Sequence, residues 1–155
     1  MSDLQREVNK RNPFDAPEQE ATLNILRTAD RLSAAFDELF RRHGITGPQY
    51  NVLRILRGHG RPIPSQQIGR ELLTRVPDVT RLVDRLEKAG LVERARTTTD
   101  RRVVLVSITP RGLKLLEELD RPVLDLHRAQ LRHLTRDELA ELNRLLVKAR
   151  SAVST

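Results

Sequence analysis

Residues 91–112 constrain the fold of this 155-residue chain more than any other stretch. They contain two short runs of strand-forming residues, 91–94 and 103–108, joined by a polar tip rich in arginine. The second run is apolar and β-branched, so it predicts a half-buried strand. Gly90 closes a helix just before the first run, and Thr109-Pro110 opens another helix just after the second. The sequence therefore predicts a β-hairpin placed directly between two helices.

Helical periodicity fills the rest of the chain after a polar segment, residues 1–17, which we expect to be a flexible N-terminal tail. A Ser65 N-cap is expected to begin the short helix that follows Pro64. We predict a mainly α (α+β) fold of about six helices with a β-hairpin, in which residues 65–108 form a helix-turn-helix and a β-wing. The expected helices cover residues 18–43, 46–58, 65–73, 76–88, 111–134 (bent or broken near Pro122) and the stretch after a Thr135 capping box.

Positive charge is concentrated around the hairpin. The formal net charge is +7, and residues 61–112 carry eleven Arg or Lys against six Asp or Glu, so they supply five of the seven net charges. The bases are mostly arginine, whose guanidinium group matches phosphates and guanine edges in a bidentate manner. This distribution favours a nucleic-acid partner.

Several classes of protein find no support in the sequence. Cysteine is absent, which excludes disulfides and thiol chemistry. No apolar run approaches a membrane span, and the N-terminus lacks the core of a signal peptide, so we expect a cytoplasmic, nucleoid-associated protein. We find no phosphate-binding loop, GxGxxG or GxSxG motif, and hence expect no enzyme and no cofactor. The four histidines show no paired spacing for a metal. They are His43, His59, His127 and His133.

The helix that precedes the hairpin carries the predicted DNA-reading residues. Val79, Leu82, Val83 and Leu86 share one face at helical spacing and are expected to be buried. Residues at the N-terminus of a recognition helix reach base edges, and the short helix before it offers a phosphate contact. The alternative for the exposed face is an ordinary solvated surface. The candidates are Arg75, Asp78, Thr80 and Arg81 for bases, and Ser65 and Gln66 for a phosphate.

The tip of the hairpin supplies a second group of candidates. Asp100 stands two residues before Arg102, a spacing that places both side chains on one side of an extended chain. Asp100 is expected to orient Arg102, which would enter a minor groove. We expect Arg94, Arg96 and Arg101 to contact phosphates.

The ordered motifs resemble the MarR family of winged-helix transcription regulators. They run from Val79 to Arg94 as VTRLVDRLEKAGLVER, then Asp100-Arg101-Arg102, then ITPRG at residues 108–112, with TGPQYNVL at residues 46–53 similar to the opening of the second helix in that family. The likeness covers roughly residues 20–150. It maps the recognition helix onto residues 76–89, but Val76-Pro77-Asp78 departs from the usual start, which leaves its N-cap between Thr74 and Arg75.

The resemblance implies an obligate homodimer. Dimerisation helices would cover about residues 18–43 and 111–151, and a DNA-binding lobe about residues 48–109, within a single domain over residues 18–155. Members often respond to small aromatic or phenolic ligands bound between these parts. Here such a pocket could be lined by Phe36, Phe40, His43 and Tyr50, with the alternative that these aromatics are only core.

We therefore predict a sequence-specific regulator that binds a pseudo-palindromic operator in double-stranded DNA as a homodimer. Repression relieved by a small aromatic ligand is favoured. The alternatives are a transcriptional activator of the same fold or an architectural DNA-binding protein of low specificity.

Overall fold

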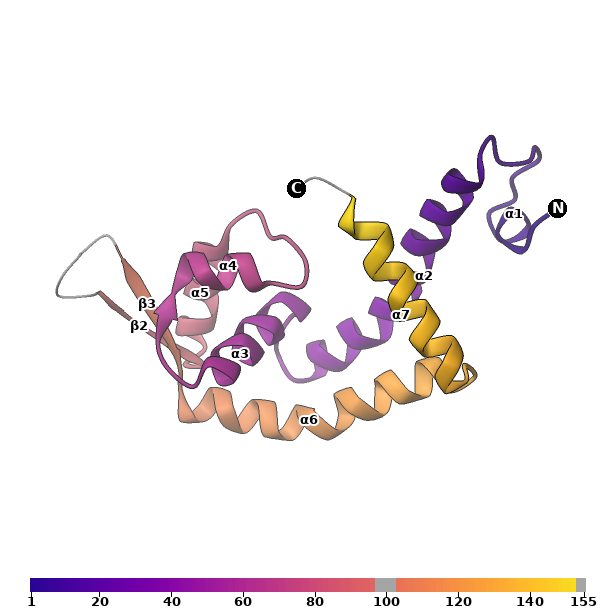
Figure 1. Cartoon of the computed structure of the whole chain (residues 1–155). Helices are drawn as coiled ribbons and strands as arrows, with labels where there is room; N and C mark the ends of the chain where they lie inside the picture. Colours follow the sequence, from indigo (N-terminus) through magenta and orange to yellow (C-terminus); the bar gives the residue numbers. More distant parts are fainter. Residues whose placement is uncertain (97–102, 153–155) are drawn as a thin grey trace.

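The computed structural model describes residues 1–96 and 103–152, in which a small antiparallel sheet lies at one end of a mainly helical molecule (Figure 1). The predicted fold class is confirmed. The described residues form α1 (Asp3–Glu7), α2 (Pro17–Arg42), α3 (Gly47–His59), β1 (Ile63–Pro64), α4 (Ser65–Glu71), α5 (Val79–Lys88), β2 (Val92–Arg96), β3 (Val104–Ile108), α6 (Pro110–Leu131) and α7 (Arg136–Ser151).

The sheet contains one strand more than the predicted hairpin. β2 and β3 pair antiparallel with Arg94 opposite Val106, and β1 adds to the other side of β3 with Ile63 also opposite Val106. β1 has only two residues, and one of them is Pro64. A proline fits because β1 is an edge strand, where a missing N–H breaks no ladder. So short a run carries no periodic signal, which explains why the sequence does not reveal it.

The core lies where the sheet meets the first half of α6. Leu53 of α3, Ile68 of α4, Leu86 of α5, Val106 of β3 and Leu116 of α6 all have no exposed surface. Burying a side chain of this size contributes about 1.5–3 kcal/mol. Five elements therefore share one apolar cluster, which fixes the recognition helix against the long helix α6.

A close approach at Gly112 joins α6 to the sheet. A Cβ atom at Gly112 would lie 2.4 Å from the carbonyl oxygen of Leu91 and 2.7 Å from Cγ1 of Ile108. The adjacent Thr109 caps α6 by accepting from the Gly112 N–H (3.1 Å), and its hydroxyl donates to the carbonyl of Gly90 (2.7 Å). The end of α5, the start of β2 and the start of α6 are thereby tied together.

The helices α2, α6 and α7 extend away from the sheet, and the N-terminus lies at the far side of the molecule from the wing (Figure 1). α6 continues through Pro122 as one bowed helix, so the predicted disturbance there is a bend and not a break. Thr135 and Glu138 form the predicted capping box of α7. No residue of α7 is buried, and its Leu142 and Leu145 are 37% and 48% exposed.

The N-terminal segment contains a short helix that the sequence does not predict. Ser2 and Gln5 form a capping box at the start of α1, and Leu4 is only 3% exposed. The carboxylate of Glu7 pairs with Arg27 and Arg31 of α2 at 2.9 and 3.0 Å. The flexibility of residues 1–17 stays a prediction, but the segment carries defined secondary structure and contacts α2.

We expect Gly112→Ala to destabilise the protein by at least about 2 kcal/mol, because the new methyl group would overlap a backbone carbonyl that cannot move freely. Gly58→Ala is the matched control. Gly58 lies in α3 with nothing within 4 Å of a built Cβ, and alanine there should stabilise the helix by about 0.5–1 kcal/mol. Urea unfolding of both variants tests this. Equal stabilities would contradict the close approach at Gly112.

Candidate nucleic-acid interface

Helices α4 and α5 form a closely packed helix-turn-helix. A Cβ at Gly69 of α4 would lie 3.0 Å from Cγ2 of Val79 at the start of α5, so glycine allows the two helices to approach. On α5, Val83 and Leu86 are buried, while Val79 and Leu82 are half-buried against the core. The predicted buried face of α5 is thus confirmed, with Val79 and Leu82 less covered than Val83 and Leu86.

The recognition helix begins later than predicted. Asp78 is its N-cap, with its carboxylate accepting from the Arg81 N–H at 2.9 Å, and α5 starts at Val79. The predicted start at Val76 and the N-cap at Thr74 or Arg75 are wrong. Pro77 disfavours helical geometry at the residue before it, and aspartate is among the best N-caps, so the helix starts after both.

This start changes the roles of the predicted base-contacting residues. Asp78 caps α5 through Oδ1, which leaves Oδ2 as the oxygen for the predicted base contact. Arg75 lies exposed in the turn between α4 and α5. Arg81 lies exposed in the first turn of α5, on the side away from Val83 and Leu86. Thr80, also exposed, lies at the flank of that side. They remain the two base-reading candidates best placed by the helix.

The start of α4 also differs from the prediction. Pro64, with extended backbone, is its N-cap and Ser65 is its first residue, without a side-chain capping bond. The predicted Ser65 N-cap is therefore wrong. Proline fixes the φ angle at the boundary, and the chain enters the helix directly from β1. Ser65 is half-buried and Gln66 is exposed, so Gln66 is the more accessible of the two predicted phosphate contacts.

Arg94 braces the recognition helix against the wing. Its guanidinium donates to Glu87 at 2.9 and 2.6 Å and also pairs with Asp84, while its backbone N–H donates to Glu87 at 3.2 Å. This hydrogen bonding lowers the pKa of the Glu87 carboxyl group, which keeps it ionised. Both carboxylates come from α5 and Arg94 from β2. The predicted phosphate role thus competes with two ion pairs that hold β2 in place.

The wing strands carry Arg94 and Arg96 two residues apart, so their side chains point to the same face of β2. Arg96 is exposed and lies opposite Val104 at the end of the described hairpin. The predicted contacts Asp100, Arg101 and Arg102 lie outside the described residues. Their roles remain predictions from the sequence and the resemblance.

An aromatic cavity of about 360 Å³ lies between α2, α3 and α6. The rings of Phe40 and Tyr50 stack with centroids 4.5 Å apart, and Phe36 lies 4.5 Å from the ring of His127. Burial raises the pKa of the Tyr50 phenol, so its hydroxyl stays protonated at neutral pH. Three of the four predicted pocket residues therefore meet at one cavity.

Other lining residues of this cavity are not predicted from the sequence. His127 comes from α6, and Arg54 and Asn51 lie on the face of α3 that carries Tyr50. Leu73, from the turn between α4 and α5, also lines the cavity although it is 79% exposed. No spacing within a single helix signals such a set, because the residues come from separate elements.

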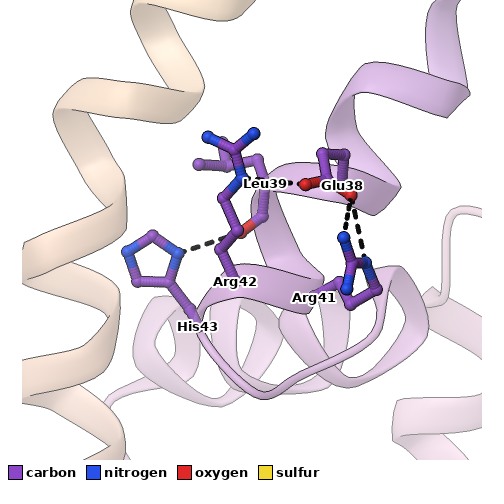
Figure 2. A network of polar contacts seen from close by, with 5 residues as sticks. All are labelled: Glu38, Leu39, Arg41, Arg42 and His43. Carbon is purple, nitrogen blue, oxygen red and sulfur yellow. Dashed lines mark hydrogen bonds and ion pairs between the residues drawn. The ribbon is translucent and has the colours of Figure 1, made fainter.

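His43 does not line the aromatic cavity, contrary to the prediction. Its Nδ1 lies 2.9 Å from the carbonyl oxygen of Leu39, and Figure 2 shows its ring turned away from Arg41 and toward the neighbouring helix. Glu38 pairs with both Arg41 and Arg42 on the other side. His43 is the C-cap residue of α2, and it lines a different cavity with Ile45 and residues of α6.

An exposed, braced helix-turn-helix next to a basic β-wing defines a winged helix-turn-helix DNA-binding protein. Comparison with known proteins narrows the class. A family model described as the MarR family matches residues 43–103. The multiple antibiotic resistance protein MarR of Salmonella typhimurium is 38% identical over 105 residues, which cover 67% of this chain and 72% of that protein.

Two solved structures extend the likeness to nearly the whole chain. A MarR transcription factor from Planctomyces limnophilus is 47% identical, with a TM-score of 0.68, covering 86% of this chain and 98% of that one. A mutant of MarR from E. coli, complexed with operator DNA, is 32% identical with a TM-score of 0.72, covering 96% and 99%. The chain belongs to the MarR family. It is a DNA-binding transcriptional regulator, in a family of regulators and not of enzymes.

Within residues 1–96 and 103–152, no helix combines the length and the apolar character needed to cross a bilayer.

If Arg94 braces the wing and does not bind phosphate, Arg94→Gln should lower DNA affinity roughly tenfold at fixed salt, without changing the slope of log K against log salt. A lost phosphate contact would instead reduce that slope by about 1. Arg96→Gln, two residues along the same strand face, is the control that we expect to reduce the slope. Fluorescence anisotropy with labelled duplex DNA between 50 and 200 mM salt measures both. An equal slope change in the two variants would contradict the brace.

Proposed function

We propose that this regulator binds a pseudo-palindromic operator as a homodimer and represses transcription until a small aromatic ligand releases it. The observation that carries the proposal is the pairing of an exposed recognition helix, braced by Arg94 of the wing, with an aromatic cavity that contacts the turn before that helix. The operator complex of the E. coli relative supports the DNA partner. Such a role places the protein with the nucleoid in the cytoplasm.

We assign recognition of the DNA sequence to the first turn of α5 and to the wing. Thr80 and Arg81 would face base edges in the major groove, with Gln66 and Ser65 near one phosphate and Arg75 near another. Arg96 and Arg101 would contact phosphates, and Arg102, oriented by Asp100, the minor groove. The assignments of Asp100, Arg101 and Arg102, which lie outside the described residues, rest on the sequence and the family resemblance.

We assign the dimer interface to the end of the molecule opposite the wing. There α2 exposes Ile25 (44%) and Leu26 (61%), and α7 exposes Leu145 (48%) and Val147 (52%). Monomeric proteins rarely expose large apolar patches without a partner. We propose residues 18–43 and 111–151 as the dimerisation helices and residues 48–109 as the DNA-binding lobe, within one domain over residues 18–155. Two recognition helices would then address half-sites about 34–36 Å apart.

The ligand is assigned to the aromatic cavity. Its volume of about 360 Å³ suits a one-ring compound. Phe36 and Phe40 would stack on the ring, and the Tyr50 hydroxyl and the Arg54 guanidinium would bind its polar group. Because Leu73 lines the cavity from the turn before α5, a ligand there favours one position of the recognition helix over another. Salicylate should release operator DNA from the wild type, and Phe36→Ala should weaken that response.

Selection of bound fragments from the source genome, followed by competition with bulk DNA, tests sequence-specific binding. Arg81→Ala should relax the preference at one position of the selected site by about 5- to 150-fold, the equivalent of 1–3 kcal/mol. Arg128→Ala, an exposed arginine of α6, is the control and should leave the preference unchanged. A uniform loss across all sequences would make Arg81 a phosphate contact. If bulk DNA competes for the protein as effectively as the selected fragment does, the protein is an architectural DNA-binding protein of low specificity.

Leu145→Glu should convert the dimer to a monomer, because it places a charge in the proposed apolar interface without disturbing any buried residue. Asn143→Glu, exposed on the same helix, is the matched control and should remain dimeric. Sedimentation velocity at several protein concentrations measures the state. A Leu145→Glu protein that stays dimeric would contradict the assignment of α7 to the interface.

A further inference from the structure

A second cavity, of about 390 Å³, lies where the end of α2, the turn after α5 and the first turns of α6 meet. It shares no lining residue with the aromatic cavity. Its walls combine basic groups with an apolar floor, in contrast to the stacked rings of the aromatic cavity. A ligand of this cavity should therefore differ in chemistry from a ligand of the aromatic cavity.

The cavity wall formed by α6 is cationic. Arg111 and Lys114 lie three residues apart, on the same side of the helix, and both are exposed toward the cavity. In the described residues, the ion pairs of α6 engage Asp120, Arg121, Asp125 and Arg128, and neither of the two cavity cations. Glu118 is the single carboxylate among the lining residues, so the wall keeps a net positive charge.

The opposite wall offers a hydrogen-bonding group and an apolar surface. His43 uses Nδ1 toward the carbonyl of Leu39, which in the neutral ring leaves Nε2 as an acceptor on the side that faces α6 (Figure 2). Ile45 and Leu91, each 5% exposed, line the floor together with the half-buried Leu115.

We propose that this cavity binds a small organic anion. Its carboxylate or phosphate group binds Arg111 and Lys114, and its apolar body lies against Ile45 and Leu91. Nε2 of His43 accepts from a hydroxyl or acid proton of the occupant. Glu118 disfavours a second anionic group at its end of the cavity, so the occupant carries its charge at one end only.

The position of the cavity gives such an occupant a regulatory role. Ala89 and Leu91, which line it, flank the turn that joins the recognition helix to the wing, while Arg111 and Lys114 belong to the long helix α6. A bound anion bridges these parts. The site is therefore a second effector site, independent of the aromatic cavity and of any ligand bound there.

Arg111 and Lys114 could also serve only to stabilise the fold, and the two residues differ in this respect. The Arg111 side chain lies against Gly90, with Nη1 3.7 Å from a Cβ built there, where it faces the carbonyl end of α5. Arg111 thus also stabilises the fold, whereas Lys114 takes part in none of the side-chain hydrogen bonds or ion pairs found among residues 1–96 and 103–152. Substitution of Lys114 therefore tests ligand binding without a change in the stability of the fold.

Isothermal titration of the full-length protein with phenyl phosphate tests the site, with benzyl alcohol as the neutral comparison. We expect saturable binding of phenyl phosphate that weakens at least tenfold in Lys114→Gln, with the melting temperature unchanged. Lys148→Gln, the same substitution on the exposed surface of α7, should bind within twofold of the wild type. No saturable binding, or equal affinity in both variants, would overturn the proposal. Preference for benzyl alcohol over phenyl phosphate would do the same.

Discussion

The short joint between Gly90 and Gly112 is the interaction on which the rest of the molecule depends. The Thr109 hydroxyl donates to the Gly90 carbonyl at 2.7 Å and accepts from the Gly112 N–H at 3.1 Å, and the Thr109 N–H donates to the Leu91 carbonyl at 3.1 Å. These bonds are shielded from water, since Thr109 is only 8% exposed, so water cannot replace them without cost. They set the angle between the recognition helix and the long helix α6.

In the proposed function, this joint carries a change at one end of the molecule to the DNA-binding elements at the other. In the proposed dimer, α2, α6 and α7 fix the separation of the two lobes, and each lobe can serve a fixed half-site spacing only if it is held firmly on α6. Arg57 of α3 adds to the connection through paired hydrogen bonds to Asp120 of α6, at 2.9 and 2.7 Å. Within the lobe, Arg94 holds the wing to α5. The proposed anion site is lined by Leu91 and Arg111, which lie beside the joint.

The predictable part of the structure is the part encoded in local signals. Gly90, Thr109-Pro110 and the β-branched run before them predict the wing and its flanking helices, and Thr135 with Glu138 predicts the last helix start. The predicted start of α5 is wrong because Thr74 and Asp78 are both suitable N-cap residues. The backbone geometry set by Pro77 decides in favour of Asp78. The basic wing tip lies outside the described residues, so that part of the site still rests on sequence.

Features that depend on distant residues could not be predicted. The strand β1 exists because β3 presents a free edge, and the ion pairs of Arg94 exist because the turn at Gly90 folds β2 back along α5. The aromatic cavity was found in part, since Phe36, Phe40 and Tyr50 lie on faces that a helical period reveals. His127 was missed because its contact with Phe36 depends on how α6 crosses α2.

The central claim is that the joint at Thr109 positions the recognition helix for DNA. Its most direct test is the affinity of Thr109→Val and Thr109→Ser for a genomic fragment selected by the wild type, measured at fixed salt. Valine keeps the shape but removes both hydroxyl bonds, whereas serine keeps the hydroxyl. The account predicts that Thr109→Val binds the fragment at least about tenfold more weakly, a loss near 1.4 kcal/mol, while Thr109→Ser stays close to the wild type. Equal affinity of the two folded variants would contradict it.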